Sequence, residues 1–356
     1  MSQPALFRFF PQLATSIPWV QLAERTPVGR LAVAGKRWGH DRLFIKREDR
    51  TATLYGGNKV RNLEFILGEA LARGASRIVT VAPLGSNFVA ALAAQASRVG
   101  LDVEVEHFVP VRSHQIDTHA NFSAAAGASL SLHAGRRGAV GAASVAALKL
   151  ATSADAFWCA PGGSSVTGAL GHLNAALELA EQVRAGEIPQ PDAIVVGAGT
   201  CGTMAGLTAG FRLAGLDVRL IGVRCVDRVV CHRRAIARLA NGVLARVGAS
   251  GRVHASDITL VDSPFDHGYG VPLGRAEELM ASFEADEGIR LDTTYTSKVV
   301  AKLGELLDSG IFTGKNVLYW HTFSPAAMHW GQGRRQEGLE FLNAGQRAAG
   351  AVLALS

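Results

Sequence analysis

The sequence is poor in cysteine and has no long apolar run, and these shortages exclude several classes of protein. Only four cysteines occur in 356 residues, and no pair has the short spacing of a zinc site, so we expect no metal centre. Four cysteines in so long a chain make no disulfide framework, which favours the reducing cytoplasm. Arg, Asp, Glu or Gly interrupts each apolar run before it reaches membrane-spanning length, so no membrane segment is expected.

Clustered basic charge and a secretory leader are also missing. The formal net charge is +6, but the basic residues are scattered, apart from short pairs at Arg233-Arg234 and Arg334-Arg335. A solvated surface explains this scatter better than a nucleic-acid site does. Residues 1–4 show no basic patch followed by an apolar block, so no signal peptide is expected.

What the sequence does contain is a regular alternation of apolar strands and helical segments. Strands are expected at residues 43–46, 77–81, 103–109, 129–132, 193–196, 219–223 and 317–321. Helices are expected from Lys59 to about Gly74, from the residues after Asn87 to Gly100, and at 113–126, 139–152 and 168–184, with another after Gly333. Strand, helix, strand at this spacing predicts an α/β fold of parallel sheets with helical crossovers.

The stretch at residues 55–64 places two glycines before a lysine and an amphipathic helix. Gly56 and Gly57 carry no Cβ, so the backbone can approach a flat or charged group closely. Lys59 falls in the first turn of the helix, where the helix dipole disfavours the charged amine. A neutral amine can form a Schiff base with an aldehyde, and our hypothesis is that Lys59 holds pyridoxal 5′-phosphate (PLP). The plainer alternative is a turn before a helix with a solvated lysine.

A glycine-rich loop at residues 197–203 follows the strand at 193–196 and opens a helix. Backbone N–H groups at such a helix start favour an anion, and Thr200 and Thr203 add hydroxyl donors, so the loop is predicted to cradle a phosphate. The loop also matches the dinucleotide pattern Gly-x-Gly-x-x-Gly, and Arg224 after the next strand could accept an NADP phosphate. An NADP site and a tight turn without a ligand therefore remain alternatives.

Ser86 and Asn87 lie in the same kind of place, between a strand and a helix. Ser and Asn are common helix caps, which is the plain interpretation of this pair. The functional interpretation is a hydroxyl and an amide that face a cofactor ring.

Taken in order, these motifs resemble the fold-type II PLP enzymes that include D-cysteine desulfhydrase and 1-aminocyclopropane-1-carboxylate (ACC) deaminase. The resemblance spans roughly residues 20–330 and is far more specific than any single motif. The matching segments are Lys46-Arg47-Glu48-Asp49, Gly56-Gly57-Asn58-Lys59-Val60-Arg61, Ser86-Asn87, Gly162-Gly163-Ser164 with Gly168 to Gly171, Gly199 to Gly206, Gly268-Tyr269-Gly270-Val271-Pro272, Tyr295 with Lys298, and His321-Thr322.

The resemblance implies a two-domain architecture like that of the tryptophan synthase β-chain, with PLP as cofactor and a homodimer as the assembly. Residues 1–55 and 185–356 would form a larger domain that binds the PLP phosphate. Residues 56–184 would form a smaller domain that carries Lys59 and the Ser86-Asn87 loop.

The resemblance also implies roles for individual residues. Lys59 would be the Schiff-base lysine and the base that moves the substrate α-proton, and Asn87 would hydrogen-bond the PLP phenolic oxygen. Ser86, Tyr269 and Tyr295 would face the substrate, although a turn aromatic and a core residue are the plain alternatives for the two tyrosines. The phosphate would be held by the backbone of Gly199, Thr200, Cys201, Gly202 and Thr203.

Thr296 discriminates within the family, because ACC deaminases have Glu at this position beside the pyridine nitrogen. An uncharged hydroxyl there resembles the desulfhydrase branch. The expected substrate pocket also departs from the family pattern. Phe88 follows Ser86-Asn87 and Phe323 follows Thr322, and both make the pocket more apolar. Asn62 replaces a common lysine, so phosphate binding loses one cation.

The activity implied is that of a PLP-dependent carbon–sulfur or carbon–heteroatom lyase or deaminase. It would act on a small amino acid by β-elimination, releasing a keto acid and ammonia, in the manner of D-cysteine desulfhydrase. Within PLP chemistry the alternatives are β- or γ-replacement, racemisation and ACC deaminase-like ring opening. Outside it, an NADP oxidoreductase or a non-catalytic binder remains.

Overall fold

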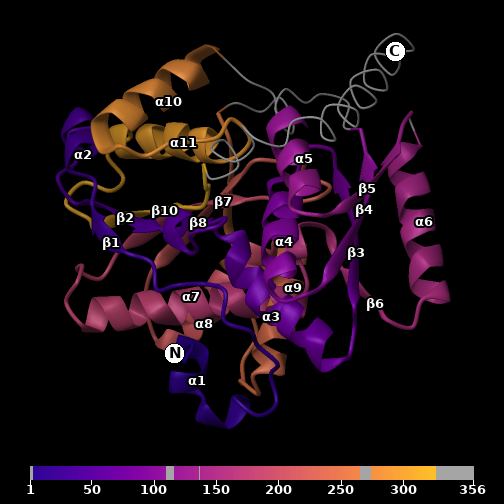
Figure 1. Ribbon diagram of the computed structural model, residues 1–356. Coiled ribbons are helices and arrows are strands. Elements are labelled where there is room, and N and C mark those ends of the chain that lie inside the picture. The colour runs from indigo at the N-terminus through magenta and orange to yellow at the C-terminus, as the bar shows by residue number, and fades with distance from the viewer. Residues whose placement is uncertain (1–2, 110–115, 136, 265–273, 326–356) are drawn as a thin grey trace.

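The computed structural model describes residues 3–109, 116–135, 137–264 and 274–325, and it contains two sheets flanked by helices (Figure 1). The predicted helix after Gly333 and the segment around Tyr269 lie outside the described residues. Within the described ranges, no helix combines the length and apolar character needed to cross a lipid bilayer. The same ranges hold no cluster of three or more His, Cys, Asp or Glu side chains suited to a metal ion.

The smaller sheet has four parallel strands in the order β5-β4-β3-β6. Its strands are β3 (Arg77–Pro83), β4 (Asp102–Phe108), β5 (Ser129–His133) and β6 (Ala156–Cys159). The helices around it are α3 (Lys59–Ala72), α4 (Asn87–Arg98), α5 (Ile116–Ala125) and α6 (Gly138–Thr152). The sequence pattern did not predict β6, a four-residue edge strand whose Trp158 is 42% exposed.

The larger sheet has six strands in the order β1-β2-β10-β7-β8-β9, and only β1 pairs in the antiparallel sense. Its strands are β1 (Val28–Arg30), β2 (Leu43–Arg47), β7 (Ala193–Ala198), β8 (Arg219–Arg224), β9 (Thr259–Asp262) and β10 (Val317–His321). The α/β prediction of parallel sheets flanked by helices is confirmed.

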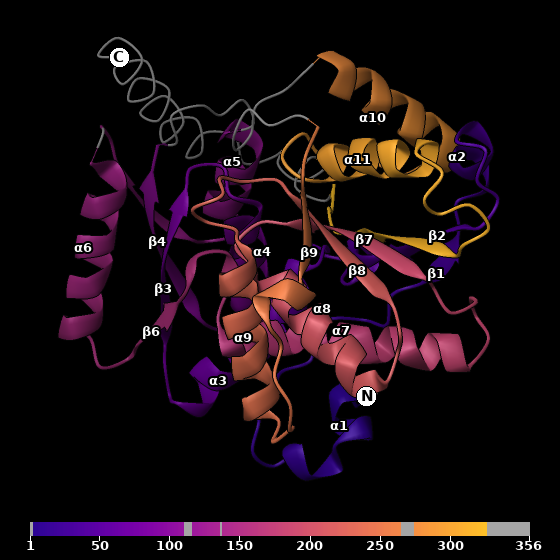
Figure 2. The ribbon, with the colours of Figure 1, turned by 180° about the vertical axis from the view of Figure 1, so that it is seen from behind.

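Helices cover both faces of the larger sheet, as Figures 1 and 2 show from opposite sides. One face carries α7 and α8, with α9 and the N-terminal α1 beyond them, and the other carries α2, α10 and α11. These helices are α1 (Ala5–Phe9), α2 (Ala32–Arg37), α7 (Val166–Arg184), α8 (Gly202–Ala214), α9 (Arg233–Arg246), α10 (Gly274–Glu287) and α11 (Thr296–Asp308). Such double cover requires strands that are apolar on both sides.

Strand β10 shows how this double burial is encoded. Leu318 and Trp320 point into the core under α7 and α8, whereas Val317 and Tyr319 point into the core under α11. All four side chains are fully buried. Alternate residues of a strand point to opposite faces, so one continuous apolar run supplies two cores. This run places the end of β10 at the centre of the molecule.

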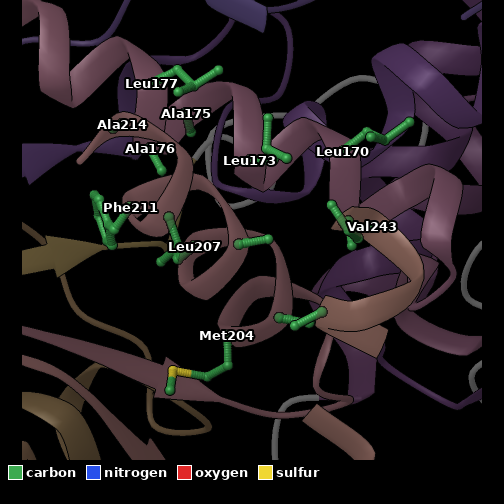
Figure 3. Close-up of a cluster of buried hydrophobic side chains, with 14 of the residues drawn as sticks. Leu170, Leu173, Ala175, Ala176, Leu177, Met204, Leu207, Phe211, Ala214 and Val243 are labelled. Carbon is green, nitrogen blue, oxygen red and sulfur yellow. The ribbon is translucent and has the colours of Figure 1, made fainter. Parts of the chain in front are cut away.

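The packing of α7 against α8, whose apolar side chains Figure 3 shows, depends on glycines in α8. A Cβ on Gly206 would lie 2.3 Å from the carbonyl oxygen of Ala169, and a Cβ on Gly210 would lie 2.5 Å from the Cβ of Ala176. Leu173 and Leu207 fill the remaining space. Each such leucine contributes about 1.5–3 kcal/mol on burial. The close approach fixes the N-terminus of α8, where the predicted phosphate loop ends.

Candidate functional site

A cavity lies where four helices begin and two strands end. The starts of α3, α4, α8 and α11 meet there with the ends of β7 and β10. The lining residues are Tyr55, Gly56, Gly57, Asn58, Lys59, Asn87, Gly197, Gly199, Thr200, Cys201, Gly202, Thr203, Met204, Asp292, Tyr295, Thr322, Phe323 and Ser324. Helix N-termini converge on this point, so the cavity favours a ligand that carries an anion.

The glycine turn before α3 is held against the end of β10. The N–H of Asn58 donates to the carbonyl oxygen of Thr322 at 3.1 Å, and the N–H of Gly57 donates to the carbonyl oxygen of Glu48 at 2.8 Å. Gly57 has a φ of +92°, and a Cβ there would lie 3.0 Å from the Thr322 oxygen. Only glycine fits such a conformation at such a distance. The turn therefore fixes where Lys59 starts its helix.

Lys59 lines the cavity with an amine that has one long hydrogen bond, from Nζ to the carbonyl oxygen of Gly162 at 3.4 Å. Part of the residue's surface is accessible from the cavity, but the protein around the amine desolvates it and lowers its pKa to about 8. The sequence predicted a lowered pKa from the helix dipole. The direction is confirmed, but burial is the cause. More of the amine is therefore neutral near neutral pH than for an exposed lysine.

A buried ion network holds the start of α3 from behind. Arg61 is 2% exposed, and its guanidinium group donates to Glu48 at 3.0 Å and to Glu178 at 2.9 Å. Lys46 from β2 donates to the same Glu178 at 2.5 Å. Burial alone would raise the pKa of Glu178, but the charges of Arg61 and Lys46 lower it to about 2. The network joins α3, α7 and β2 into one support for Lys59.

The predicted phosphate loop follows β7 and ends in the first turn of α8. The Ser164 hydroxyl donates to Thr200 Oγ1 at 2.6 Å and accepts from the N–H of Gly202 at 3.2 Å. A Cβ on Gly199 would lie 3.0 Å from the Tyr295 ring, so a side chain there would close this end of the cavity. The Thr203 hydroxyl accepts from Asn58 at 3.0 Å and contacts His172 at 3.1 Å. That hydroxyl is therefore bonded to side chains of other segments, and residues 199–203 all line the cavity.

Thr296, expected beside the cofactor ring, is bonded to a neighbouring carboxylate. Its hydroxyl donates to Asp292 Oδ1 at 2.5 Å, and its side chain is absent from the lining of the cavity in the described part of the chain. Asp292 itself lines the cavity, and the sequence motifs did not predict it. Burial raises the pKa of this carboxyl group, which also accepts N–H bonds from residues 294–296 at the start of α11. An acidic residue just before a helix is a common cap, and that signal could have found it.

The side chains at the start of α4 lie in different places, some at the cavity and some in the core. Asn87 lines the cavity, and Ser86 occupies the N-cap position of α4 without a side-chain capping bond. Phe88, expected in the substrate pocket, is 3% exposed and packs in the core of the smaller sheet. A Cβ on Gly163 would lie 2.9 Å from its ring. Among the described residues Ser86 and Phe88 are not part of the lining.

Other predicted residues also have defined places. Thr322 and Phe323 line the cavity, as expected for the pocket. Asn62 lies outside the lining and donates to the carbonyl oxygen of Gly163 at 3.2 Å. Arg224, the residue that an NADP phosphate would need, is paired with Asp262 at 2.7 Å. Arg224 is therefore already paired, and the NADP alternative is left without a cation for the phosphate at this position.

The residues present fit PLP. The cavity brings an amine of lowered pKa, the amide of Asn87 and a helix N-terminus with a glycine-rich loop around one space. Side chains at Gly199 or Gly57 would fill that space or strain the chain beside it. An aldehyde, a phenolic oxygen and a phosphate each have a matching group here.

Comparison with known proteins gives the same picture. A family model described as pyridoxal-phosphate dependent enzyme matches residues 20–322. D-cysteine desulfhydrases of Salmonella newport and Salmonella typhimurium are each 32% identical over 297 residues, which cover 80% of this chain and 88% of the relative. A solved structure of an ACC deaminase homologue superposes with a TM-score of 0.78 at 27% identity, covering 95% and 99% of the two chains. An O-ureido-L-serine synthase, 17% identical with a TM-score of 0.62 over 96% of this chain and 99% of its own, shares the fold.

Proposed function

Because the chain belongs to the family of pyridoxal-phosphate dependent enzymes, we propose that it releases a keto acid and ammonia from a small amino acid by β-elimination. The class of enzyme, a PLP-dependent lyase or deaminase of fold type II, follows from the family. The substrate is our proposal. We take D-cysteine first, because curated relatives at 32% identity are D-cysteine desulfhydrases.

The observation that carries the proposal is the amine of Lys59 in the cavity, with a pKa lowered to about 8. We assign Lys59 two tasks, to hold the cofactor covalently and then to accept the substrate α-proton at Nζ. When bound, PLP supplies an electrophilic aldehyde and an aromatic ring that accepts electron density from the substrate. A lysine of ordinary pKa would be almost wholly protonated at neutral pH and could do neither task well.

The remaining groups would orient the cofactor. We assign Asn87, which lines the cavity, to donate its amide to the phenolic oxygen, and the backbone of residues 199–203, at the N-terminus of α8, to bind the phosphate. Tyr295 lies against Gly199 and would bound the space for the substrate. Ser86 and Tyr269 stay in the proposal from the sequence, since Ser86 precedes Asn87 directly and Tyr269 lies outside the described residues.

ACC deaminase-like ring opening is a second candidate, and Asp292 favours it. A carboxylate near the ring nitrogen would keep that nitrogen protonated and strengthen the ring as an electron acceptor. Asp292 lines the cavity. It precedes Thr296 by four residues and accepts a hydrogen bond from the Thr296 hydroxyl. β- or γ-replacement is supported less well. Phe88 and Phe323 were both expected to line the substrate pocket, and of the two only Phe323 lines the cavity.

Product analysis tests these candidates. The holoenzyme is incubated with D-cysteine, L-cysteine, D-serine or ACC, and keto acid, ammonia and sulfide are measured, with Lys59→Ala as the control. We expect pyruvate, ammonia and sulfide in equal amounts from D-cysteine, and none from the variant. Turnover of ACC with no reaction on D-cysteine would move the assignment to ring opening. Consumption of cysteine only when a second nucleophile is present would replace elimination by β-replacement.

We extend the proposal to a cytoplasmic homodimer. Free thiols at all four cysteines agree with a reducing compartment. Val140 and Leu148 on α6 are 66% and 63% exposed, so that helix offers apolar surface to a second copy. Analytical ultracentrifugation of the holoenzyme would give the mass of a dimer, and a monomer at micromolar concentration would remove this part of the proposal.

A further inference from the structure

One residue of the phosphate loop carries a thiol. Cys201 is the N-cap residue of α8, lines the cavity and is 5% exposed. Its φ is 74°, and it is the sole non-glycine residue with a positive φ in the described ranges. A side chain in this conformation costs on the order of 1 kcal/mol that glycine would not. A strained residue at a ligand site often marks a function of its side chain.

A second thiol reaches the same place from another part of the chain. Cys231 ends the loop between β8 and α9, and its side chain is fully buried. Cys201 and Cys231 belong to the same cluster of buried side chains. The Cys201 thiol donates to the carbonyl oxygen of Val230, the residue before Cys231, at 3.6 Å. The loop itself reaches the surface, since Val229 is 88% exposed.

The surroundings make the two thiols unequal. The Cys231 thiol and the N–H of His232 both donate to Cys201, and despite burial they lower its pKa to about 7. The pKa of Cys231 is raised, because Cys201 holds its proton and the side chain is buried. The N-terminus of α8 adds a positive field at Cys201. A thiol of lowered pKa beside a thiol of raised pKa is the arrangement of an attacking cysteine with its resolving partner.

The other two cysteines lack these features. Cys159 and Cys225 are buried, and burial raises the pKa of each to about 12. Neither lines the cavity. They serve as internal controls for the reactivity of Cys201.

We propose that Cys201 and Cys231 form a reversible site of oxidation by hydroperoxides, and that the resulting disulfide weakens the binding of the cofactor. The Cys201 sulfur attacks the O–O bond of hydrogen peroxide, which gives a sulfenic acid and one water. The Cys231 sulfur then attacks that sulfur, the S–O bond breaks, and the hydroxyl group leaves with the thiol proton as a second water. Two thiols and one peroxide thus become one disulfide and two waters.

The consequence for the cofactor follows from the geometry of the loop. A disulfide requires a sulfur–sulfur distance of about 2.05 Å, much shorter than the contact between two separate thiols. Forming it draws Cys201 toward Cys231 and moves the backbone N–H groups of residues 201–203. The inference rests on the proposed role of residues 199–203 as the phosphate-binding loop. Because Cys201 lines the cavity, bound PLP should slow its oxidation.

The experiment treats the holoenzyme and the cofactor-depleted protein with hydrogen peroxide, blocks remaining thiols and digests without reduction. Trypsin places the four cysteines on separate peptides, residues 150–184, 185–212, 225–228 and 229–233. We expect a peptide pair joining 185–212 to 229–233, formed faster without PLP. The affinity for PLP, read from its visible absorbance, should fall at least about tenfold (about 1.4 kcal/mol) and recover with a thiol reductant.

Two variants complete the test. Cys231→Ser should keep its absorbance and activity before oxidation, form no linked pair and recover less with reductant, whereas Cys159→Ser should behave as the parent chain. No linked pair, a pair that includes 225–228, or a pair without loss of PLP affinity would overturn the proposal. The linked pair is read by mass alone, so a wrong substrate assignment would leave this result unchanged.

Discussion

The amine of Lys59 shows how a functional group can lower the stability of the folded chain. Lys59 has a pKa of about 8 in the folded chain, against an ordinary value of 10.5, because burial disfavours its charged form. Below pH 8 the folded protein must keep a charge that the unfolded chain solvates freely. A buried lysine at this position therefore stabilises the folded state less than an apolar side chain would.

Replacing Lys59 by Met should stabilise the cofactor-free protein at pH 7 by about 1–3 kcal/mol. The unfolded chain binds more protons than the folded chain between pH 8 and 10.5, so the stability of the parent protein rises with pH in this window. The advantage of Met should therefore be full below pH 8 and shrink toward pH 10.5. Urea denaturation at pH 7 and pH 10 measures both values. An unchanged or lowered stability at pH 7 would show that the amine is not desolvated.

At this scale the sequence predicted the chemical groups better than their orientation. Lys59, Asn87 and the glycine loop could be found because each follows a turn signal that only a few residue types satisfy. The bond between the Thr296 hydroxyl and Asp292 could not be predicted, because no spacing in the sequence reveals that contact. Phe88 was assigned to the pocket from its neighbours, but an aromatic ring at the start of a buried helix can equally enter the core.

Among the elements, α8 depends most on a residue type that lacks a side chain. Gly206→Ala would place a Cβ 2.3 Å from the Ala169 carbonyl oxygen and 2.5 Å from the His172 Cβ. We expect a loss of about 1–3 kcal/mol from overpacking, although alanine favours helix. Gly141→Ala in α6 is the matched control, because its Cβ would meet an ordinary contact at 3.4 Å. Thermal unfolding of both variants decides the point, and equal melting temperatures would contradict the packing described for α7 and α8.

The network that supports α3 gives an element-scale prediction with a pH window. Arg61→Met would leave Glu48 and Glu178 with one buried cation fewer, and we expect a loss of about 3–5 kcal/mol at pH 7. The stabilisation from Glu178 is present above pH 4.5 and disappears as the pH falls toward 2, so the loss in the variant should shrink over that range. Arg77→Met is the control, because the Arg77 side chain is 39% exposed and solvent screens its ion pairs, so its loss should be much smaller. Denaturant curves at pH 7 and pH 3 measure the free energy of unfolding of both variants. Equal losses in Arg61→Met and Arg77→Met would contradict this account.

For the whole molecule, the strands separate into two sheets that use different parts of the chain. The smaller sheet takes strands from residues 77–159, and the larger sheet takes strands from residues 28–47 and 193–321. This membership supports the proposed division into residues 56–184 and residues 1–55 with 185–356, which stays a prediction. The alternation of strands and helices was visible in the sequence. The antiparallel edge strand β1 was not, because three residues carry too little pattern.

Removing the cofactor should lower the stability of both sheets together. The cavity is lined from α3 and α4 beside one sheet and from β7 and β10 of the other, so a ligand there links them. At a PLP concentration of 100 times Kd the gain is about 2.7 kcal/mol. Calorimetry with and without PLP should show one transition that shifts as a whole, with a smaller shift for Lys59→Ala. Two transitions, of which only one moves, would show that the cofactor contacts a single unit.

The central claim is a covalent link between Lys59 Nζ and the aldehyde carbon of PLP, and borohydride reduction followed by peptide mass analysis tests it most directly. The purified protein should absorb in the visible range, lose that band on reduction and carry the reduced cofactor on the tryptic peptide of residues 51–61. Lys59→Ala should show neither the band nor the adduct. A colourless protein in excess PLP, or an adduct on a different lysine such as Lys298, would contradict the account.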